Sequence, residues 1–172
     1  RWGYVHEDGS LDYWDDPWWG GSIFLLADKL YLYTGDAGVL ESAFPSLKAY
    51  VDFLSSTAED HIISWSLGDW LDLNPDPNSQ ASNLTPVAQT STAGYYWMSR
   101  KLADYAQILG YDKRLSEHYR ELADSIKDKF NREFLDYETG IYAENSQTAQ
   151  ALPLALGLVP DEMEEKVRQR LL

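Results

Sequence analysis

The sequence predicts an all-α fold of helical hairpins with long, decorated loops. Three observations support this prediction. Apolar residues recur at helical spacing through most of the chain, the helical stretches come in pairs joined by short turns, and almost nothing alternates with the period of a strand. A chain of 172 residues that is 44% hydrophobic fits one domain and can bury a core.

The first predicted hairpin begins at Ile23. Thr34-Gly35-Asp36 supplies a helix stop followed by a new start, and Pro45 predicts a kink or a new first turn in the second helix. The stripes expected to face the core are Ile23, Leu26, Leu30 and Tyr33, then Leu40, Phe44, Leu47, Val51 and Leu54.

The second hairpin follows a long gap in the periodicity. Thr85-Pro86 predicts an N-cap with proline at the first helical position, Gly110 ends that helix, and the next starts just after Asp112. The expected core stripes are Val87, Ser91, Tyr95, Met98, Leu102, Tyr105 and Leu109, then Leu115, Tyr119, Leu122, Ile126 and Phe130.

The third pair is shorter. Asn145 or Ser146 is expected to cap a helix that Pro153 kinks, and Pro160 opens the last helix. Short strands are expected only in connecting loops, over residues 61–65 and 140–143.

One connection stands out because helical periodicity is absent from Glu59 to Leu84. Usual connections have about 4–6 residues, and much longer ones in compact domains are commonly functional. This loop carries Gly68-Asp69-Trp70. We therefore expect one end of the helical bundle to be elaborated, which is where helical toroids place sugar clefts.

Two loops combine tryptophan with carboxylates, at residues 12–21 and 65–74, and together they hold five of the seven tryptophans. An indole can cover the apolar face of a pyranose, while Asp or Asn orients its hydroxyls. The pattern predicts a concave carbohydrate site centred on Asp69 and Trp70, with both loops meeting at one mouth. The structural alternative is that these tryptophans plug the end of the bundle.

Charge and composition exclude several classes of partner. The net charge of -14 opposes binding to nucleic acid or to an anionic membrane surface. No apolar run approaches the roughly 20 residues that cross a bilayer. The chain has no cysteine, and its three histidines lack metal-ligand spacing, so neither a metal site nor a cofactor is predicted.

A calcium loop is the one metal pattern worth weighing. Asp72, Asn74, Asp76 and Asn78 alternate as calcium ligands do, but Pro77 stands where an EF-hand needs glycine. The twelfth position, which needs Glu, is Asn83. A stiff, extended loop explains the segment more simply.

Neither end of the sequence looks like the end of a protein. Arg1-Trp-Gly-Tyr4 contains no initiator methionine or signal-peptide core, and Val167 to Leu172 stops within a helical pattern. We expect the chain to be part of a longer protein.

Several segments, in order, resemble one family. Pro17-Trp-Trp-Gly-Gly-Ser22 followed by Leu30-Tyr-Leu-Tyr-Thr-Gly-Asp36 is similar to the Pro-x-Trp-Gly…Tyr-x-x-Tyr-Gly-Asp segment of bacterial α-L-rhamnosidases, glycoside hydrolase family 78. Gly68-Asp-Trp-Leu71 is similar to their Gly-Asp-Trp-Leu loop. The later helices match in the same order, in Leu102-Ala-x-x-Ala-x-x-Leu-Gly110, Tyr119-x-x-Leu-Ala123, Lys129-Phe-Asn131 and Gln147-Thr-Ala149…Gly157-Leu-Val-Pro160.

The resemblance implies an (α/α)6 toroid of six hairpins, with residues 1–172 forming about half of one catalytic domain as three αα-hairpins. The remainder of that domain would be its partner. Trp19 and Trp70 would wall the subsite for a terminal rhamnose, with Asp69 orienting hydroxyls or positioning Trp70, and Trp18 and Asp16 as further substrate contacts. A bacterial periplasmic, extracellular or cytoplasmic location would fit equally.

The resemblance also shows what this segment lacks. Inverting glycosidases need a carboxylic acid and a carboxylate base about 6.5–9.5 Å apart. In the family these lie upstream and downstream of the matching segment, so no catalytic residue is assigned here. Arg132-Glu133 and Glu144 are the internal candidates, and each is better explained as a structural helix-end residue. Gly21 replaces an acidic residue that often follows Trp-Gly, which puts one polar contact in doubt.

Two alternatives to a rhamnosidase remain at this point. The toroid is compatible with another sugar, as in a glucosidase, trehalase or debranching-type hydrolase. A helical-hairpin module that binds protein or glycan without catalysis would instead predict a groove along the helices. The tryptophans concentrated in loops favour the enzyme.

Overall fold

The computed structural model describes residues 2–5, 11–14, 16–70 and 82–171. The helices are α1 Pro17–Gly20, α2 Ser22–Thr34, α3 Ala37–Thr57, α4 Val87–Ile108, α5 Lys113–Phe134, α6 Gln147–Leu156 and α7 Glu164–Arg168, with a 3₁₀ turn at Asp161–Met163. The strands are β1 Trp2–Val5, β2 Leu11–Trp14, β3 Leu135–Asp136 and β4 Ile141–Tyr142. This mostly helical chain confirms the predicted fold class.

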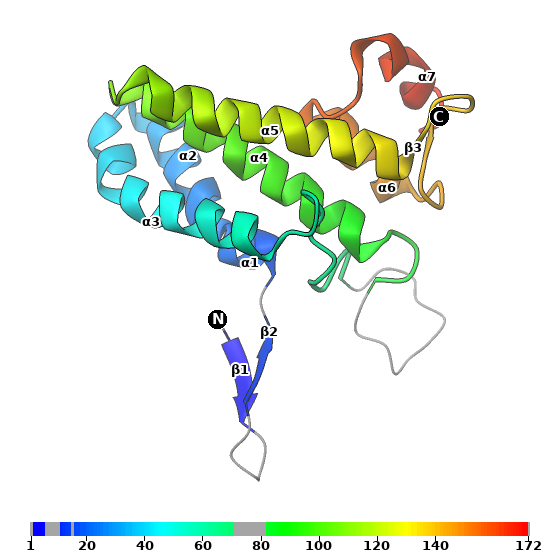
Figure 1. The fold of residues 1–172 in the computed structure, drawn as a ribbon, viewed down its shortest axis with the longest axis horizontal. Helices are drawn as coiled ribbons and strands as arrows, with labels where there is room; N and C mark the ends of the chain where they lie inside the picture. Colours follow the sequence, from blue (N-terminus) through cyan, green and yellow to red (C-terminus); the bar gives the residue numbers. More distant parts are fainter. Residues whose placement is uncertain (1, 6–10, 15, 71–81, 172) are drawn as a thin grey trace.

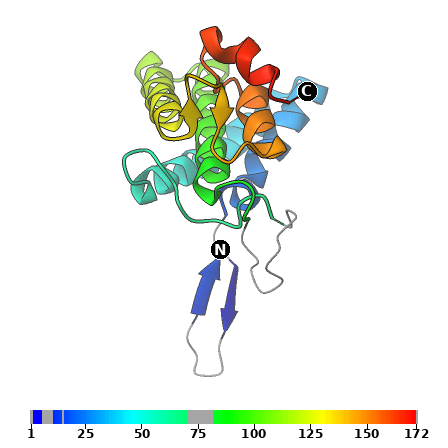
Figure 2. The ribbon, with the colours of Figure 1, turned by 90° about the vertical axis from the view of Figure 1, so that its right-hand side faces the viewer.

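The three predicted hairpins are present as α2–α3, α4–α5 and α6–α7 (Figure 1). α4 lies at the centre and contacts α1, α3, α5 and α6. Two antiparallel strand pairs are added, β1 with β2 and β3 with β4. Figures 1 and 2 show the β1–β2 hairpin projecting from the helical body beside α1. Within the described ranges, no helix is long and apolar enough to span a bilayer.

The core follows the predicted stripes in α3, where all five expected residues are buried. α4 is buried around most of its circumference, including a polar run from Gln89 to Thr92. The stripe predicted for α2 is wrong except at Ile23, which packs against the core. Leu26, Leu30 and Tyr33 are 61%, 41% and 82% exposed, and Phe24 and Ala27 are the buried residues. α2 is apolar on most sides, so spacing alone does not select its inward face.

Two kinds of connection join the helices. Three short turns, after α2, α4 and α6, each place a glycine in the left-handed region, with φ of +69° at Gly35, +70° at Gly110 and +72° at Gly157. This is the common helix stop that glycine allows without a steric penalty. The long connections, residues 58–86 and 135–146, lead instead into the first turns of α4 and α6.

The described parts of the long connections lie at one end of the molecule. Thr85 Oγ1 is 2.6 Å from Ser146 Oγ, and Gln89 Nε2 donates to the carbonyl of Ala149 at 2.8 Å, so α4 and α6 begin side by side. α1 joins them, because Trp18 Nε1 donates to the carbonyl of Thr90. We call α1 with residues 58–70, 82–86 and 135–146 the long-loop end.

Several local predictions need correction. Thr85 is not the N-cap of α4, since its hydroxyl pairs with Ser146 and the helix begins at Val87. Of the two alternatives for Pro45, the new first turn is wrong, because α3 continues through this residue. Pro153 lies inside α6 as predicted. The segment 61–65 forms only an isolated bridge, between Glu59 and Ile62, whereas β4 lies inside the predicted 140–143 strand. The β1–β2 hairpin was not predicted.

The remaining caps agree with the sequence. Asp112 accepts from the backbone N–H of Arg114 and caps α5. Of the two candidates for α6, Ser146 is the cap and accepts from the N–H of Ala149. Asn145 instead adopts a positive φ of 59° just before the helix.

Candidate functional site

Trp19 of α1 and Trp70 of the long loop meet at the long-loop end. Their ring centroids are 6.0 Å apart and their planes are inclined by 69°, an edge-to-face arrangement. Trp19 is 50% exposed and Trp70 is 45% exposed. The prediction that the two tryptophan clusters meet is therefore confirmed for this pair, and neither ring is buried. We call Trp19 and Trp70 the ring pair.

The position of Trp19 is set by α1, whose first turn is held by several contacts. Asp16 is the N-cap, and Pro17 fits the first turn, where a missing N–H costs nothing. Gly20 follows Trp19 at a close approach, since a Cβ there would lie 2.1 Å from the hydroxyl oxygen of Tyr50. Tyr50 donates to the carbonyl of Asp16 at 3.2 Å and so holds α1 against α3.

Trp18 faces the body of the protein. Its Nε1 donates to the carbonyl of Thr90 at 2.9 Å, and its ring stacks on Trp97 with centroids 6.0 Å apart. Gly94 makes room for the indole, because a Cβ there would lie 3.1 Å from the Trp18 ring. The structure therefore gives Trp18 a packing role on α4, and its predicted contact with sugar stays a prediction.

The loop that carries Trp70 is anchored on α4 through Ser66. Ser66 Oγ lies 2.6 Å from Ser91 Oγ and accepts from the N–H of Gly68 at 2.9 Å. Gly68 has φ of +69°, and a Cβ there would lie 2.7 Å from the Cβ of Ser82. Glycine is thus required at this position both by the backbone conformation and by the space available.

Asp69 lies between Gly68 and Trp70 and is half-buried. Across the described ranges, no hydrogen bond or ion pair engages its carboxylate. A carboxylate that no described residue engages retains its capacity to accept hydrogen bonds from hydroxyl groups. Its place next to Trp70 fits the predicted role in orienting a sugar.

Asp16, the remaining predicted substrate contact, forms hydrogen bonds to the protein backbone. It is 8% exposed. Oδ1 accepts from the backbone N–H groups of Trp18 and Trp19 at 2.8 and 3.0 Å, and Oδ2 accepts from the N–H of Leu67 at 3.1 Å. The structure thus uses both carboxylate oxygens to join α1 to the long loop.

Gly21 explains the departure from the family pattern. A Cβ at this position would lie 2.5 Å from the sulfur of Met98 and 2.5 Å from the carbonyl oxygen of Pro17. No side chain fits there with the present neighbours. The polar contact that an acidic residue would make is therefore not available from position 21.

The two internal carboxylate candidates differ in setting. Glu133 lies 3.4 Å from Lys129 in an i,i+4 ion pair on α5, which supports its structural interpretation. Glu144 is exposed in the turn before α6, between Ala143 and Asn145, whose φ angles are 43° and 59°. The calcium-like pattern at 72–78 lies outside the described residues.

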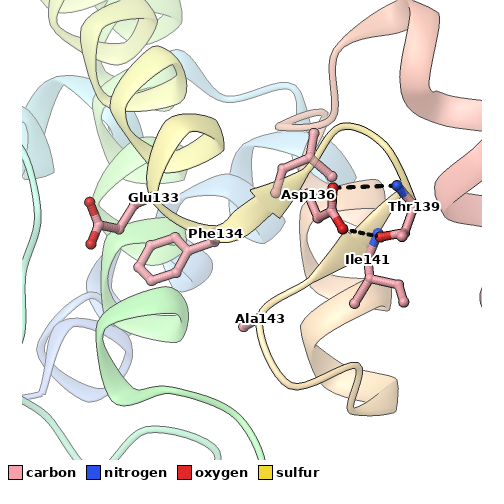
Figure 3. Close-up of a pocket in the computed structure, with 7 residues that line it drawn as sticks. Glu133, Phe134, Asp136, Thr139, Ile141 and Ala143 are labelled. Atoms are coloured by element: carbon pink, nitrogen blue, oxygen red, sulfur yellow. Dashed lines mark hydrogen bonds between the residues drawn. The ribbon is translucent and has the colours of Figure 1, made fainter.

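A shallow hollow of about 370 Å³ lies between the end of α5 and the β3–β4 hairpin (Figure 3). Asp136 points into the turn of this hairpin, where it accepts from Thr139 Oγ1 at 2.6 Å and from the N–H of Glu138 at 2.8 Å. These bonds from Thr139 and Glu138 lower the pKa of Asp136. Its carboxylate is therefore occupied in shaping the turn.

Sequence reasoning missed the serine contact between the long loop and α4. Ser66 and Ser91 each look unremarkable in isolation. The usable signal was Ser91 within the stripe expected to face the core, because a hydroxyl buried there can hold a hydrogen-bond partner from another segment. Thr92 supplies another such contact, since its hydroxyl accepts from the N–H of Ile63 at 3.1 Å.

Paired helices with their long connections gathered at one end, and exposed indoles beside a carboxylate at that end, define a chain of the six-hairpin glycosidase type. Comparison with known proteins agrees. Residues 8–172 match the bacterial α-L-rhamnosidase six-hairpin glycosidase domain. The chain belongs to this family.

Individual relatives support the assignment. An α-L-rhamnosidase of Alteromonas sp. (strain LOR) is 29% identical over 151 residues, which cover 86% of this chain and 16% of the relative. The structure of α-L-rhamnosidase from Dictyoglumus thermophilum is 36% identical with a TM-score of 0.79, covering 91% of this chain and 18% of that one. The Streptomyces avermitilis α-L-rhamnosidase complexed with L-rhamnose is 25% identical with a TM-score of 0.76, covering 88% and 14%.

The chain thus spans about one sixth of the length of the curated relatives it matches, 16% for the Alteromonas protein. It is a part of the glycosidase domain, with three hairpins described here.

Proposed function

We propose that the whole protein removes terminal α-L-rhamnose from glycans or glycosides, and that the ring pair with Asp69 forms part of the subsite for this sugar. The observation that carries the proposal is the meeting of Trp19 and Trp70, both about half exposed, beside a carboxylate that no described residue engages. The L-rhamnose complex of the related Streptomyces avermitilis enzyme supports this choice of sugar.

The geometry of the ring pair suits a 6-deoxy sugar. Two indole planes inclined by 69° form a corner rather than a flat platform. One wall of such a corner can cover the C–H face of the pyranose while the other contacts the methyl group. Asp69, next to Trp70 in the chain, would accept hydrogen bonds from ring hydroxyls.

The hydrolytic step in this proposal uses two carboxyl groups supplied by the rest of the protein. One protonates the leaving-group oxygen, and the other activates a water molecule on the opposite face of the sugar, about 6.5–9.5 Å away. The described part of this chain contributes binding and orientation. Inversion is the stereochemical outcome expected of this arrangement.

We further propose that the remainder of the catalytic domain covers α2. Its outer side exposes Leu25, Leu26, Leu30, Leu32 and Tyr33 by 40%, 61%, 41%, 65% and 82%. A helix that is apolar on most sides is normally buried in a larger protein. The adjoining helices of the toroid are the natural cover for this surface.

Trp70→Ala in the whole enzyme tests the binding proposal. The substitution removes one wall of the corner, so we expect KM for an aryl α-L-rhamnoside to rise about tenfold or more, in line with the value of aromatic contacts. Tyr137→Ala is the matched control, since Tyr137 is 48% exposed but belongs to the β3–β4 turn. A Trp70→Ala enzyme with wild-type kcat and KM would refute the assignment.

A second substrate tests the role of the methyl group. An aryl α-L-mannoside differs from the rhamnoside by one hydroxyl on C6, which would face the apolar corner. We expect kcat/KM to fall about 10-fold to 100-fold, because apolar pockets reject an added hydroxyl only moderately. Equal kcat/KM for the two substrates would contradict a methyl group packed against indole.

A further inference from the structure

We propose that Asp16 is a positioning residue that sets the geometry of the ring pair through one carboxylate bound to both segments. Trp19 lies in α1 and Trp70 lies in the long loop. Asp16 accepts one hydrogen bond from Trp19 itself and another from Leu67, three residues before Trp70. The functional meaning of this inference rests on the sugar-binding role proposed above. The geometric part can be tested separately.

The first link fixes Trp19. Asp16 Oδ1 accepts from the N–H of Trp19 itself at 3.0 Å, as well as from the N–H of Trp18 at 2.8 Å. These are the otherwise unpaired donors of the first helical turn, and a capping carboxylate also interacts favourably with the helix dipole. The backbone that carries the Trp19 ring is therefore held directly by this oxygen.

The second link fixes the loop that carries Trp70. Asp16 Oδ2 accepts from the N–H of Leu67 at 3.1 Å. The next residue, Gly68, is held by Ser66 Oγ at 2.9 Å and is confined by Ser82 and Val87. Leu67 and Gly68 thus form a fixed base from which Asp69 and Trp70 project.

The two segments also have separate attachments to α4. Trp18 Nε1 holds α1 through the carbonyl of Thr90, and Ser66 holds the loop through Ser91. Those two attachments tie each segment to α4 and do not tie the segments to each other. The Asp16 carboxylate joins the segments directly, and at 8% exposure its bonds are shielded from competing water.

Asp16→Asn separates the two links. An amide has one oxygen and one NH2 group, so whichever way it turns, it keeps an acceptor for only one side. If the oxygen stays on α1, asparagine remains a good N-cap, and the NH2 group faces the N–H of Leu67. Asp36→Asn is the matched control, because Asp36 caps α3 through the N–H of Gly38 at 2.9 Å and is exposed.

Two readouts on the whole enzyme distinguish positioning from a general loss of stability. One is the dissociation constant for L-rhamnose at a temperature where every variant is folded. The other is the part of the near-UV circular dichroism spectrum that Trp70→Ala removes, which reports the coupled indoles. For Asp16→Asn we expect about tenfold weaker rhamnose binding and loss of most of this signal, with Asp36→Asn unchanged in both.

The inference is overturned if Asp16→Asn keeps both the rhamnose affinity and the ring-pair signal within twofold of the wild type, whatever its melting temperature. Loss of affinity without loss of the signal would also contradict it, because it would place Asp16 in contact with the sugar. Should Trp70→Ala itself bind rhamnose normally, the proposed function fails, while the dichroism signal still decides whether Asp16 holds the ring pair.

Discussion

The short turns and the long-loop end join helices in different ways. At Gly35 and Gly110, a Cβ would meet nothing within 4 Å, so each turn depends only on its own backbone conformation. At Gly68, the same positive φ is combined with close contacts to Ser82 and Val87. A short turn is a local structure, whereas the long loop is determined by residues distant in the chain.

The hydrogen bonds show the same difference. The Gly35 N–H donates to the carbonyl of Tyr31 within the same helix end. At the long-loop end, Asp16 reaches Leu67, Ser66 reaches Ser91, and Thr85 reaches Ser146. Elements fixed by such distant partners can hold functional side chains in place, and binding residues are common on loops set on a rigid scaffold.

The strongest test of this comparison is the loss in the free energy of unfolding caused by Gly68→Ala and by Gly110→Ala. Both alanines need a left-handed backbone, but only the one at 68 adds contacts, with Ser82 at 2.7 Å and Val87 at 3.1 Å. We expect Gly68→Ala to lower the free energy of unfolding by about 3 kcal/mol and Gly110→Ala by about 1 kcal/mol. Urea denaturation measures both, and equal losses would contradict the distinction.

Acidification tests the helices rather than the loops. Asp28 on α2 accepts from Lys101 Nζ at 2.6 Å and from Tyr105 at 3.0 Å, both on α4. Burial raises the pKa of Asp28, but the bonds from Lys101 and Tyr105 and the charges of Lys101 and Lys29 outweigh it, so the pKa lies below its ordinary value. The stability gained from this carboxylate is present above about pH 3.9, the unfolded value, and is lost as pH falls through the folded pKa.

Asp28→Asn should therefore cost about 2 kcal/mol at pH 7, the scale of charge-assisted hydrogen bonds, and progressively less as the pH falls below about 4. Unfolding in urea at several pH values measures the difference. A difference between wild type and variant that does not change with pH would show that the charge of Asp28 is not the stabilising feature.

Trp18→Phe separates packing from sugar contact at the long-loop end. Phenylalanine keeps an aromatic ring near Trp97 but loses the Nε1 donor to Thr90. We expect a loss of about 1 kcal/mol in the free energy of unfolding, with rhamnose affinity changed less than twofold. A large loss of affinity at unchanged stability would instead support the sugar contact predicted for Trp18.

Leu26→Gln should have the smallest effect on the chain alone. Leu26 is 61% exposed, so we expect a change within about 0.5 kcal/mol in the 172-residue chain. In the whole protein, where we propose that other helices cover α2, the same change should cost about 2 kcal/mol. Thermal unfolding of both forms measures this, and equal effects would mean that α2 is not covered.

Much of the helical fold was predictable because it depends on local signals. Gly35 and Gly110 follow the ends of α2 and α4 where the sequence indicates. Asp112 and Ser146 cap the starts of α5 and α6, and the α3 stripe from Leu40 to Leu54 is buried as expected. The inward face of α2 was not predictable, because its apolar residues surround the helix. The β1–β2 hairpin was missed, since its strands are short and lack clear alternation.

The residues of the candidate site were predictable, but the contacts with distant residues that orient them were not. Aromatic and acidic residues in loops identified Trp19, Asp69 and Trp70, and the structure brings the two rings together. Trp18 could not be distinguished from Trp19 by sequence alone, since the inward orientation of the Trp18 ring depends on Gly94 and Thr90 of α4. The role of Asp16 depends in the same way on Leu67, a distant backbone partner.

Gly21 carries a consequence for variation within the family. Its backbone is enclosed by Met98 and Pro17, so an acidic side chain cannot be introduced there as a single change. A smaller residue at position 98 would not suffice, because the carbonyl oxygen of Pro17 lies equally close. An acidic residue at position 21 in a homologue therefore requires a different backbone path at the end of α1, and a redesign that adds a carboxylate there must move Pro17 as well as reduce the volume at Met98.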